Sequence, residues 1–151
     1  MASLAQQGLD EAAAWREFLT AADLNCLRTS PAPGLWSPAQ YAAHVRDMLG
    51  VFGDRILLAV AEDNPAVPWF EPGEDEWRHF NELPPSDLAT GIDHQARRLA
   101  GILDDRQADD WSRTAVRDGV DRFTVAGLAC FVVHEAHHHL LDAKGQIPAA
   151  P

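Results

Sequence analysis

Positive charge and cysteine are both scarce in this sequence, and each shortage argues against a class of protein. The 151 residues carry 12 Lys and Arg against 23 Asp and Glu, a formal net charge of -11. Such a chain repels a phosphate backbone and has no basic patch, so we expect no nucleic-acid partner. The two cysteines, Cys26 and Cys130, allow at most one bridge and do not make a secreted disulfide scaffold. Both lie in apolar helical patterns, so we expect them to be buried, reduced and inert.

Long apolar runs are missing as well. No stretch approaches the ~18 consecutive apolar residues of a membrane span, and the first ten residues lack the basic start and apolar core of a secretion signal. We therefore expect a cytoplasmic protein with no membrane partner. The 46% hydrophobic and 23% charged residues are ordinary for a globular protein, and the length fits a single domain over residues 1–151.

Four segments of the chain repeat apolar residues with the helical period. The first runs from about Leu4 to Leu27, where the breaker cluster T-S-P-A-P-G follows. The second begins with S-P-A-Q, a capping box with proline at the first helical position, and runs to about Glu62. The third spans Leu88 to Leu103, and the fourth, apolar nearly all round, spans Val125 to Lys144. We predict an all-α, up-down-type four-helix bundle whose fourth helix is the most buried.

Two irregular stretches separate these helices. The segment from Pro65 to Pro85 is too rich in proline for a long helix and too aromatic for a solvated linker. We predict a long crossover between the second and third helices, carrying a short helix at about Glu74 to Phe80. Its Trp69 and Trp77 are candidates for a pocket wall. Before the fourth helix, Asp118-Gly119 lies between two β-prone pieces and predicts a small hairpin.

The segment V-V-H-E-A-H-H-H-L-L-D, Val132 to Asp142, contains four of the seven histidines. On a helix, the four-residue separation stacks His134 over His138, so that both imidazoles can reach one divalent ion. Burying so many histidines in an apolar helix costs stability without compensation, which a bound metal or partial exposure would explain. A third ligand is available upstream in His44, near the start of the second helix. A three-histidine site leaves coordination positions open, as catalytic metals require.

The same segment also contains H-E-x-x-H, the zinc protease motif, but the sequence around it argues against a protease. The extended form of that motif needs glycine and histidine where this chain has Leu141 and Lys144. A downstream glutamate ligand is excluded, because no glutamate follows Glu135.

Two segments together resemble a known family. W-S-P-A-Q-Y-A-A-H-V-R-D, Trp36 to Asp47, is followed about ninety residues later by F-T-V-A-G-L-A-C-F-V-V-H-E-A-H-H-H. This pair resembles the DinB/YfiT superfamily of metal-binding four-helix bundles. The resemblance implies one divalent ion, Zn²⁺, Ni²⁺ or Mn²⁺, held by His44, His134 and His138. It further implies a metal-dependent hydrolase or an S-transferase that uses a low-molecular-weight thiol such as bacillithiol or mycothiol, often as a homodimer.

The resemblance leaves a second register open on the fourth helix. The related mycothiol-dependent maleylpyruvate isomerase type uses E-x-x-x-H there, and Glu135 and His139 also fit that spacing. The two registers differ by a rotation of about 100°. We prefer His134 and His138, because Phe131 and Leu141 flank them on one apolar stripe. Residues expected to support the ligands or the substrate are Glu135, Asp142 and Tyr41.

These residues predict a metal-dependent enzyme acting on a small electrophilic substrate. The ion would lower the pKa of a water or thiol and so provide a nucleophile. The alternative is a metal-binding or stress-response bundle without catalysis, which would share every ligand. Four arginines are candidates to bind a carboxylate on the substrate or thiol, and the sequence does not rank them: Arg46, Arg55, Arg97 and Arg98.

Overall fold

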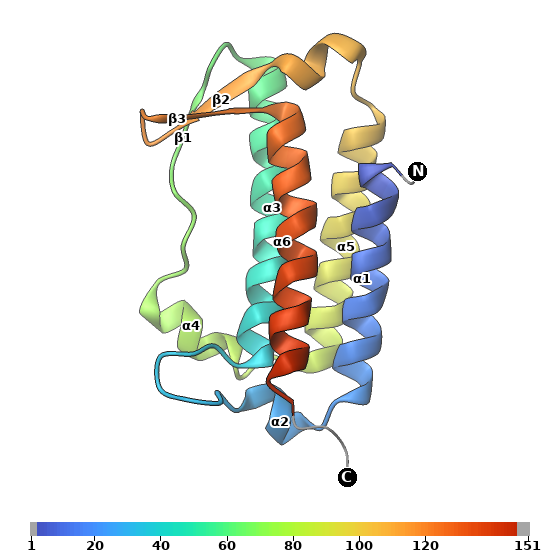
Figure 1. Cartoon of the computed structure of the whole chain (residues 1–151), viewed down its shortest axis with the longest axis vertical. Helices are drawn as coiled ribbons and strands as arrows, with labels where there is room; N and C mark the ends of the chain where they lie inside the picture. The colour runs from blue at the N-terminus through green and yellow to red at the C-terminus, as the bar shows by residue number, and fades with distance from the viewer. Residues whose placement is uncertain (1–2, 148–151) are drawn as a thin grey trace.

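Four long helices form the framework of the computed structural model, which describes residues 3–147 (Figure 1). They are α1 (Leu4–Ala21), α3 (Pro38–Ala61), α5 (Pro85–Asp104) and α6 (Val125–Gly145). The shorter elements are α2 (Leu24–Arg28), α4 (Glu74–Phe80), the 3₁₀-helix η1 (Ala108–Ser112), and the strands β1 (Ala66–Val67), β2 (Thr114–Arg117) and β3 (Asp121–Thr124). The predicted helical bundle is confirmed, with a small sheet added to it.

The long crossover sets the direction of the helices. Figure 1 shows that α3 and α5 run the same way, because the chain returns along the side of the bundle between them, whereas α1 and α6 run the opposite way. In the core, α1 packs against α5 and α6, and α3 packs against the same two helices. Trp15 of α1 is fully buried there, and its indole N–H donates to the carbonyl of Ala136 at 3.0 Å. None of the described helices has the length and apolar character needed to cross a membrane.

The predicted capping box at the start of α3 is present. The Ser37 hydroxyl accepts from the Gln40 backbone N–H at 3.1 Å, and the Gln40 side chain accepts from the Ser37 N–H at 2.8 Å. Ser37 also donates to the Asn81 side chain, and the Gln40 amide donates to the Trp77 carbonyl at 2.9 Å. The same two residues therefore begin α3 and fasten α4 to it.

The first predicted helix is in fact two helices. We expected one helix from Leu4 to Leu27, but α1 ends at Ala21 and α2 begins after Asp23. The Asp23 carboxylate accepts from the backbone N–H groups of Asn25 and Cys26 at 2.9 and 3.3 Å. Because a carboxylate that caps a new helix competes with continuing the old one, the apolar period alone did not reveal the break.

The predicted burial of the cysteines and of the last helix is wrong. Cys26 is half-buried and Cys130 is exposed. On α6, Phe131 and Leu141 are also exposed. The reason is the position of α6, which packs mainly against α1 and α3 and so keeps one face toward solvent.

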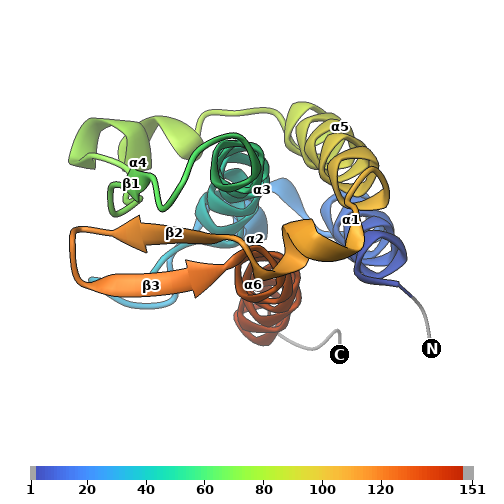
Figure 2. The same ribbon diagram turned by 90° about the horizontal axis from the view of Figure 1, so that it is seen from above.

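The predicted hairpin is present, and it holds the crossover. Asp118 and Gly119 both have positive φ, 50° and 74°, as the two central residues of a type I′ turn require, and the Val120 N–H donates to the Arg117 carbonyl at 3.0 Å. β2 pairs antiparallel with β3 and parallel with β1, which belongs to the crossover. The backbone N–H of Trp69 donates to the Asp118 carboxylate at 3.1 Å. Figure 2 shows this sheet beside α3 and α6, on the side away from α1 and α5.

Candidate metal centre

A cavity of about 220 Å³ lies between α3, α6 and the crossover. Residues of α3 at positions 44, 48, 52 and 55 and residues of α6 at positions 131, 135 and 139 line it. These spacings put each set on one face of its helix. The crossover contributes Trp69, Phe70 and Trp77, so the prediction that two of its tryptophans wall a pocket is confirmed. The pocket is therefore apolar over most of its wall, with polar groups at its two ends.

Two histidines from facing helices meet at one end of this pocket. The ring centroids of His44 on α3 and His139 on α6 are 5.3 Å apart. Phe70 stacks on the His44 ring at 5.6 Å with 8° between the planes, and Trp36 lies 5.2 Å from the same ring. The Tyr41 ring lies 5.2 Å from that of His139. Aromatic rings thus surround both imidazoles.

Burial keeps both imidazoles neutral. Burial, and then the charge of the neighbouring His139, lowers the pKa of His44 to about 4, against a smaller opposing effect of Asp47. Desolvation also lowers the pKa of His139, although Glu135 and Asp142 oppose it. In both rings Nδ1 is buried and has no hydrogen-bond partner. Such an atom costs free energy in the folded protein unless a ligand completes it.

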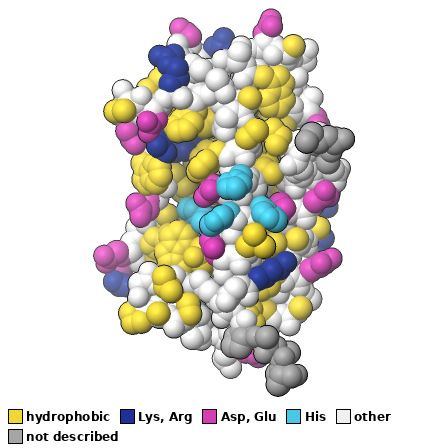
Figure 3. Space-filling model, viewed as in Figure 1, with side chains coloured by type: hydrophobic (Ala, Val, Ile, Leu, Met, Phe, Trp, Pro, Cys, Tyr) yellow, Lys and Arg dark blue, Asp and Glu magenta, His cyan; other side chains and the backbone are white. Residues whose placement is uncertain are grey.

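Glu135 adds a third potential donor on the wall of the same cavity. It lies one turn before His139 on the same face of α6, and its carboxylate Oε2 is 3.6 Å from His139 Nε2. Two neutral imidazoles and one carboxylate suit a first-row divalent ion. The unpartnered Nδ1 of His44 is the observation that such an ion would explain, because the His139 nitrogen that faces Glu135 is Nε2, and its Nδ1 lies 3.6 Å from Asp142. Figure 3 shows histidine and acidic side chains gathered on this face of the molecule beside apolar surface. The residues present therefore fit a divalent metal.

The preferred ligands of α6 lie elsewhere. His134 and His138 stack on each other as predicted, with centroids 6.0 Å apart, but both are exposed. His134 lines a separate hollow against α1, together with Cys130 and His137. The structure therefore places His44, Glu135 and His139, the register we had ranked second, on the wall of one cavity, and it places His134 outside that cavity. Phe131 belongs to the 131, 135, 139 row, so the stripe argument was wrong.

A second group of donors shares His139. The ligand atoms of His138, His139 and Asp142 all lie within 4.8 Å of one another, and His138 Nδ1 is 3.1 Å from the Asp142 carboxylate. His138 is 56% exposed, whereas His139 is 13% exposed. Asp142 is 3.6 Å from His139 Nδ1, close to where we expected a supporting carboxylate.

Several residues of the pocket wall were not predicted from the sequence. Phe70 and Glu71 come from the irregular crossover, and Arg117 comes from the hairpin. No spacing in the sequence links these segments to α3, because the contact depends on the parallel pairing of β1 with β2. The aromatic richness of the crossover was the one available signal.

The fold and this pocket define a class of protein, the four-helix bundle with histidine and carboxylate donors on two facing helices. A family model of the DinB superfamily matches residues 9–143. The chain belongs to that superfamily. No match is found among curated proteins.

Solved structures share the fold. YfiT from Bacillus subtilis, described as a probable metal-dependent hydrolase with an unusual four-helix bundle topology, is similar with a TM-score of 0.82 and 19% identity, over 95% of this chain and 83% of that one. A mycothiol-dependent maleylpyruvate isomerase is similar with a TM-score of 0.72 and 20% identity, over 96% of this chain. The present chain spans 62% of that isomerase. A histidine-to-alanine variant of the isomerase matches equally, with a TM-score of 0.71.

Proposed function

We propose that the protein is a metal-dependent enzyme in which His44, Glu135 and His139 hold one divalent ion, and that it transfers a thiol or water to a small electrophilic substrate. The observation that carries the proposal is the pair of largely buried, neutral imidazoles on facing helices, with an unpartnered Nδ1 on His44. When bound, the ion supplies Lewis-acid chemistry that lowers the pKa of a water or thiol toward neutrality.

The surrounding residues prepare the site for that chemistry. Trp36, Phe70 and Trp77 pack around His44 and exclude water, which strengthens electrostatic interactions inside the pocket. Burial, and then the charge of Asp142, raises the pKa of Tyr41, which lines a neighbouring hollow together with His139 and Asp142 and not the cavity itself.

The thiol version and the hydrolytic version draw on different relatives. One structural neighbour is mycothiol-dependent, and the other is described as a hydrolase. Nothing on the pocket wall is specific for a thiol, so we propose both nucleophiles as alternatives for one site. The homodimer implied by the resemblance also remains a proposal, for which light scattering is the direct test.

Metal analysis of single variants tests the site. We expect about one divalent ion per chain in protein purified without a histidine tag, and loss of that ion in His44→Ala, Glu135→Ala and His139→Ala. His134→Ala is the matched control, because it removes an exposed histidine from the same helix. His138→Ala separates the two donor groups. Loss of metal there, with retention in His44→Ala, would assign the ion to His138, His139 and Asp142 and contradict our site.

Turnover tests the enzyme. The metal-loaded protein is incubated with bacillithiol or mycothiol and an electrophilic acceptor, and in a parallel reaction with water as the only nucleophile. We expect at least one of the reactions to be faster with the wild type than with His44→Ala. Equal rates in every reaction would indicate a metal-binding protein without catalysis.

A further inference from the structure

A buried arginine without an acidic partner lies at the other end of the pocket. Arg55 on α3 is 8% exposed and lines the cavity. Its guanidinium donates to the Pro68 carbonyl, and its Cζ lies 4.9 Å from the centre of the Phe52 ring. Among the described residues, Arg55 forms no ion pair with an Asp or Glu side chain. A guanidinium has five N–H donors, so most of those on Arg55 remain available.

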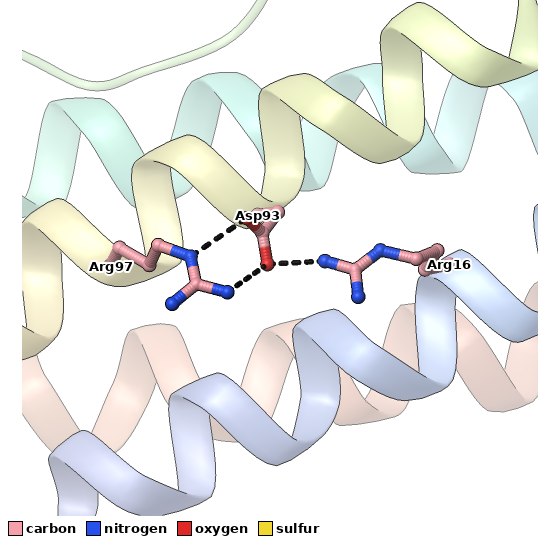
Figure 4. Close-up of polar contacts among 3 residues, drawn as sticks. All are labelled: Arg16, Asp93 and Arg97. Carbon is pink, nitrogen blue, oxygen red and sulfur yellow. Dashed lines mark hydrogen bonds and ion pairs between the residues drawn. The ribbon is translucent and has the colours of Figure 1, made fainter.

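The other candidate arginines are already paired. Figure 4 shows the Asp93 carboxylate bound by both Arg97 and Arg16, with Arg97 Nε donating at 2.8 Å. Arg46 pairs with Asp47 at 2.6 Å, and Arg98 pairs with Asp54. None of these three lines the cavity that holds His44. Of the four arginines that the sequence left unranked, only Arg55 is both in the pocket and unpaired.

A second positive charge stands beside it. Arg117 of β2 lines the same cavity, packs its guanidinium 4.5 Å from the Trp69 ring, and pairs with Asp121. Burial lowers the pKa of Arg55, and the positive charge of Arg117 lowers it further. The nearby Asp118 carboxylate accepts a hydrogen bond from the backbone N–H of Trp69. Glu71, an acidic residue that also lines the cavity, is exposed. This end of the pocket therefore offers donors to an anion.

The two ends lie on one face of α3, at a distance that a small molecule can span. Arg55 follows His44 by eleven residues, which is three turns and about 16 Å along the axis. The Arg55 guanidinium lies 4.9 Å from the centre of the Phe52 ring, which is one turn nearer to His44 on the same helix. Between them the wall is apolar, formed by Met48, Phe52 and Phe131. The cavity of about 220 Å³ is below the usual ~300–1,000 Å³ of drug-sized sites and suits a small metabolite.

We propose that the pocket selects an elongated small molecule with a carboxylate at one end, bound by Arg55, and its reacting group at the other end, beside His44 and His139. The choice of reacting end rests on the proposed function. Arginine recognises carboxylates with two parallel hydrogen bonds, and the apolar middle of the pocket favours a hydrocarbon link. The carboxylate belongs either to the electrophile or to the thiol, and both sources share this chemistry.

Binding of matched thiols to the zinc-loaded protein tests the proposal by calorimetry. Mercaptohexanoate carries the carboxylate, and mercaptohexanol replaces it with a neutral hydroxyl. We expect the carboxylate probe to bind at least tenfold more tightly, and Arg55→Met to reduce its affinity to that of the alcohol while leaving the alcohol unchanged. Arg113→Met is the matched control, because Arg113 also donates only to backbone carbonyls, those of Ala59 and Glu62, but lies outside the cavity lining.

The comparison of the two thiols on the wild-type protein tests the carboxylate proposal even if Arg55→Met fails to fold. Equal affinity of the two thiols for zinc-loaded wild type would overturn the carboxylate proposal and leave the metal-dependent function standing. If the wild type binds no metal, the proposed function fails, and hexanoate binding to the metal-free protein becomes the test. Arg55-dependent binding of hexanoate would support the anion site, and no binding would overturn it.

One further titration identifies the source of the carboxylate. If mercaptohexanol and hexanoate bind the zinc-loaded protein together, the carboxylate belongs to the electrophile. If each displaces the other, it belongs to the thiol. Either result requires hexanoate to bind, and failure of hexanoate to bind at all in this assay would contradict the proposal.

Discussion

The two sides of the bundle treat polar side chains differently. Between α1 and α5, the Asp93 carboxylate is bound by two arginines, and in the core Trp15 donates to a backbone carbonyl. Between α3 and α6, a cavity is present, and Nδ1 of both His44 and His139 lacks a hydrogen-bond partner. Among the described residues, four buried side-chain polar atoms lack one, and the other two are the amide oxygens of Gln95 and Gln146. We call the α1–α5 side complete, because its charged groups are paired, and the α3–α6 side incomplete, because its cavity has room for a ligand beside His44.

The complete side should dominate stability. We expect Trp15→Ala to lower the free energy of unfolding by about 3–5 kcal/mol, because it leaves a large cavity in the core and removes the hydrogen bond to Ala136. Urea denaturation followed by circular dichroism measures this change. Trp69→Ala is the control, since Trp69 is 56% exposed and its removal should cost far less. Equal losses of unfolding free energy in the two variants would contradict the distinction between the two sides.

The incomplete side should respond to acid. The pKa of His44 falls to about 4 in the folded protein, below the ordinary value of 6.5, so the unfolded chain takes up the proton first. The stability of the metal-free protein is therefore full above pH 6.5 and declines as the pH falls toward 4, by about 1–3 kcal/mol.

Replacing His44 with an apolar residue tests this decline. In the metal-free His44→Leu variant we expect a shallower loss between pH 6.5 and 4. At pH 7 its free energy of unfolding should be equal to or above that of the wild type, because the unpartnered Nδ1 is gone. An unchanged pH dependence in urea titrations would show that His44 is not the group responsible.

The ion pairs of the complete side should have the smallest effect. The pKa of Asp93 is lowered, mainly by its hydrogen bond with Arg97, so its contribution to stability is present above the unfolded pKa and disappears as the pH falls through the folded one. We expect Asp93→Asn to cost less than about 1 kcal/mol at pH 7, because the partner guanidiniums are solvated. At pH 3 the difference from wild type should shrink, and a constant difference would contradict the electrostatic explanation.

The sequence predicted features that depend on neighbouring residues. The capping box at Ser37 and the turn at Asp118-Gly119 each follow from two or three adjacent side chains, and both are present. The helix pair of α1 and α2 was missed, although Asp23 was visible, because the apolar period continues across the break. Caps and turns could therefore be predicted from adjacent residues where they agreed with the hydrophobic pattern.

The rotation of α6 was not predictable in the same way. Its sequence is apolar on enough faces to allow either His134 with His138 or Glu135 with His139 to face inward. The packing of α3 and of the crossover selects the second pair, through contacts such as Phe131 on Phe52 and His139 beside His44. Those partners lie about eighty or more residues away in the chain, so a helical period cannot reveal them.

The capping box of α3 links the formation of a helix to the assembly of a ligand site. Gln40 satisfies the backbone of Ser37 and also holds the carbonyl of Trp77, whose ring lies 5.7 Å from His44. The first turn of α3 and the wall of the pocket thus share one hydrogen-bond network. A chain in which that turn has frayed lacks an ordered wall next to His44, so ligand binding should slow hydrogen exchange at the backbone amides of Ser37 and Gln40, far from any direct contact with Arg55.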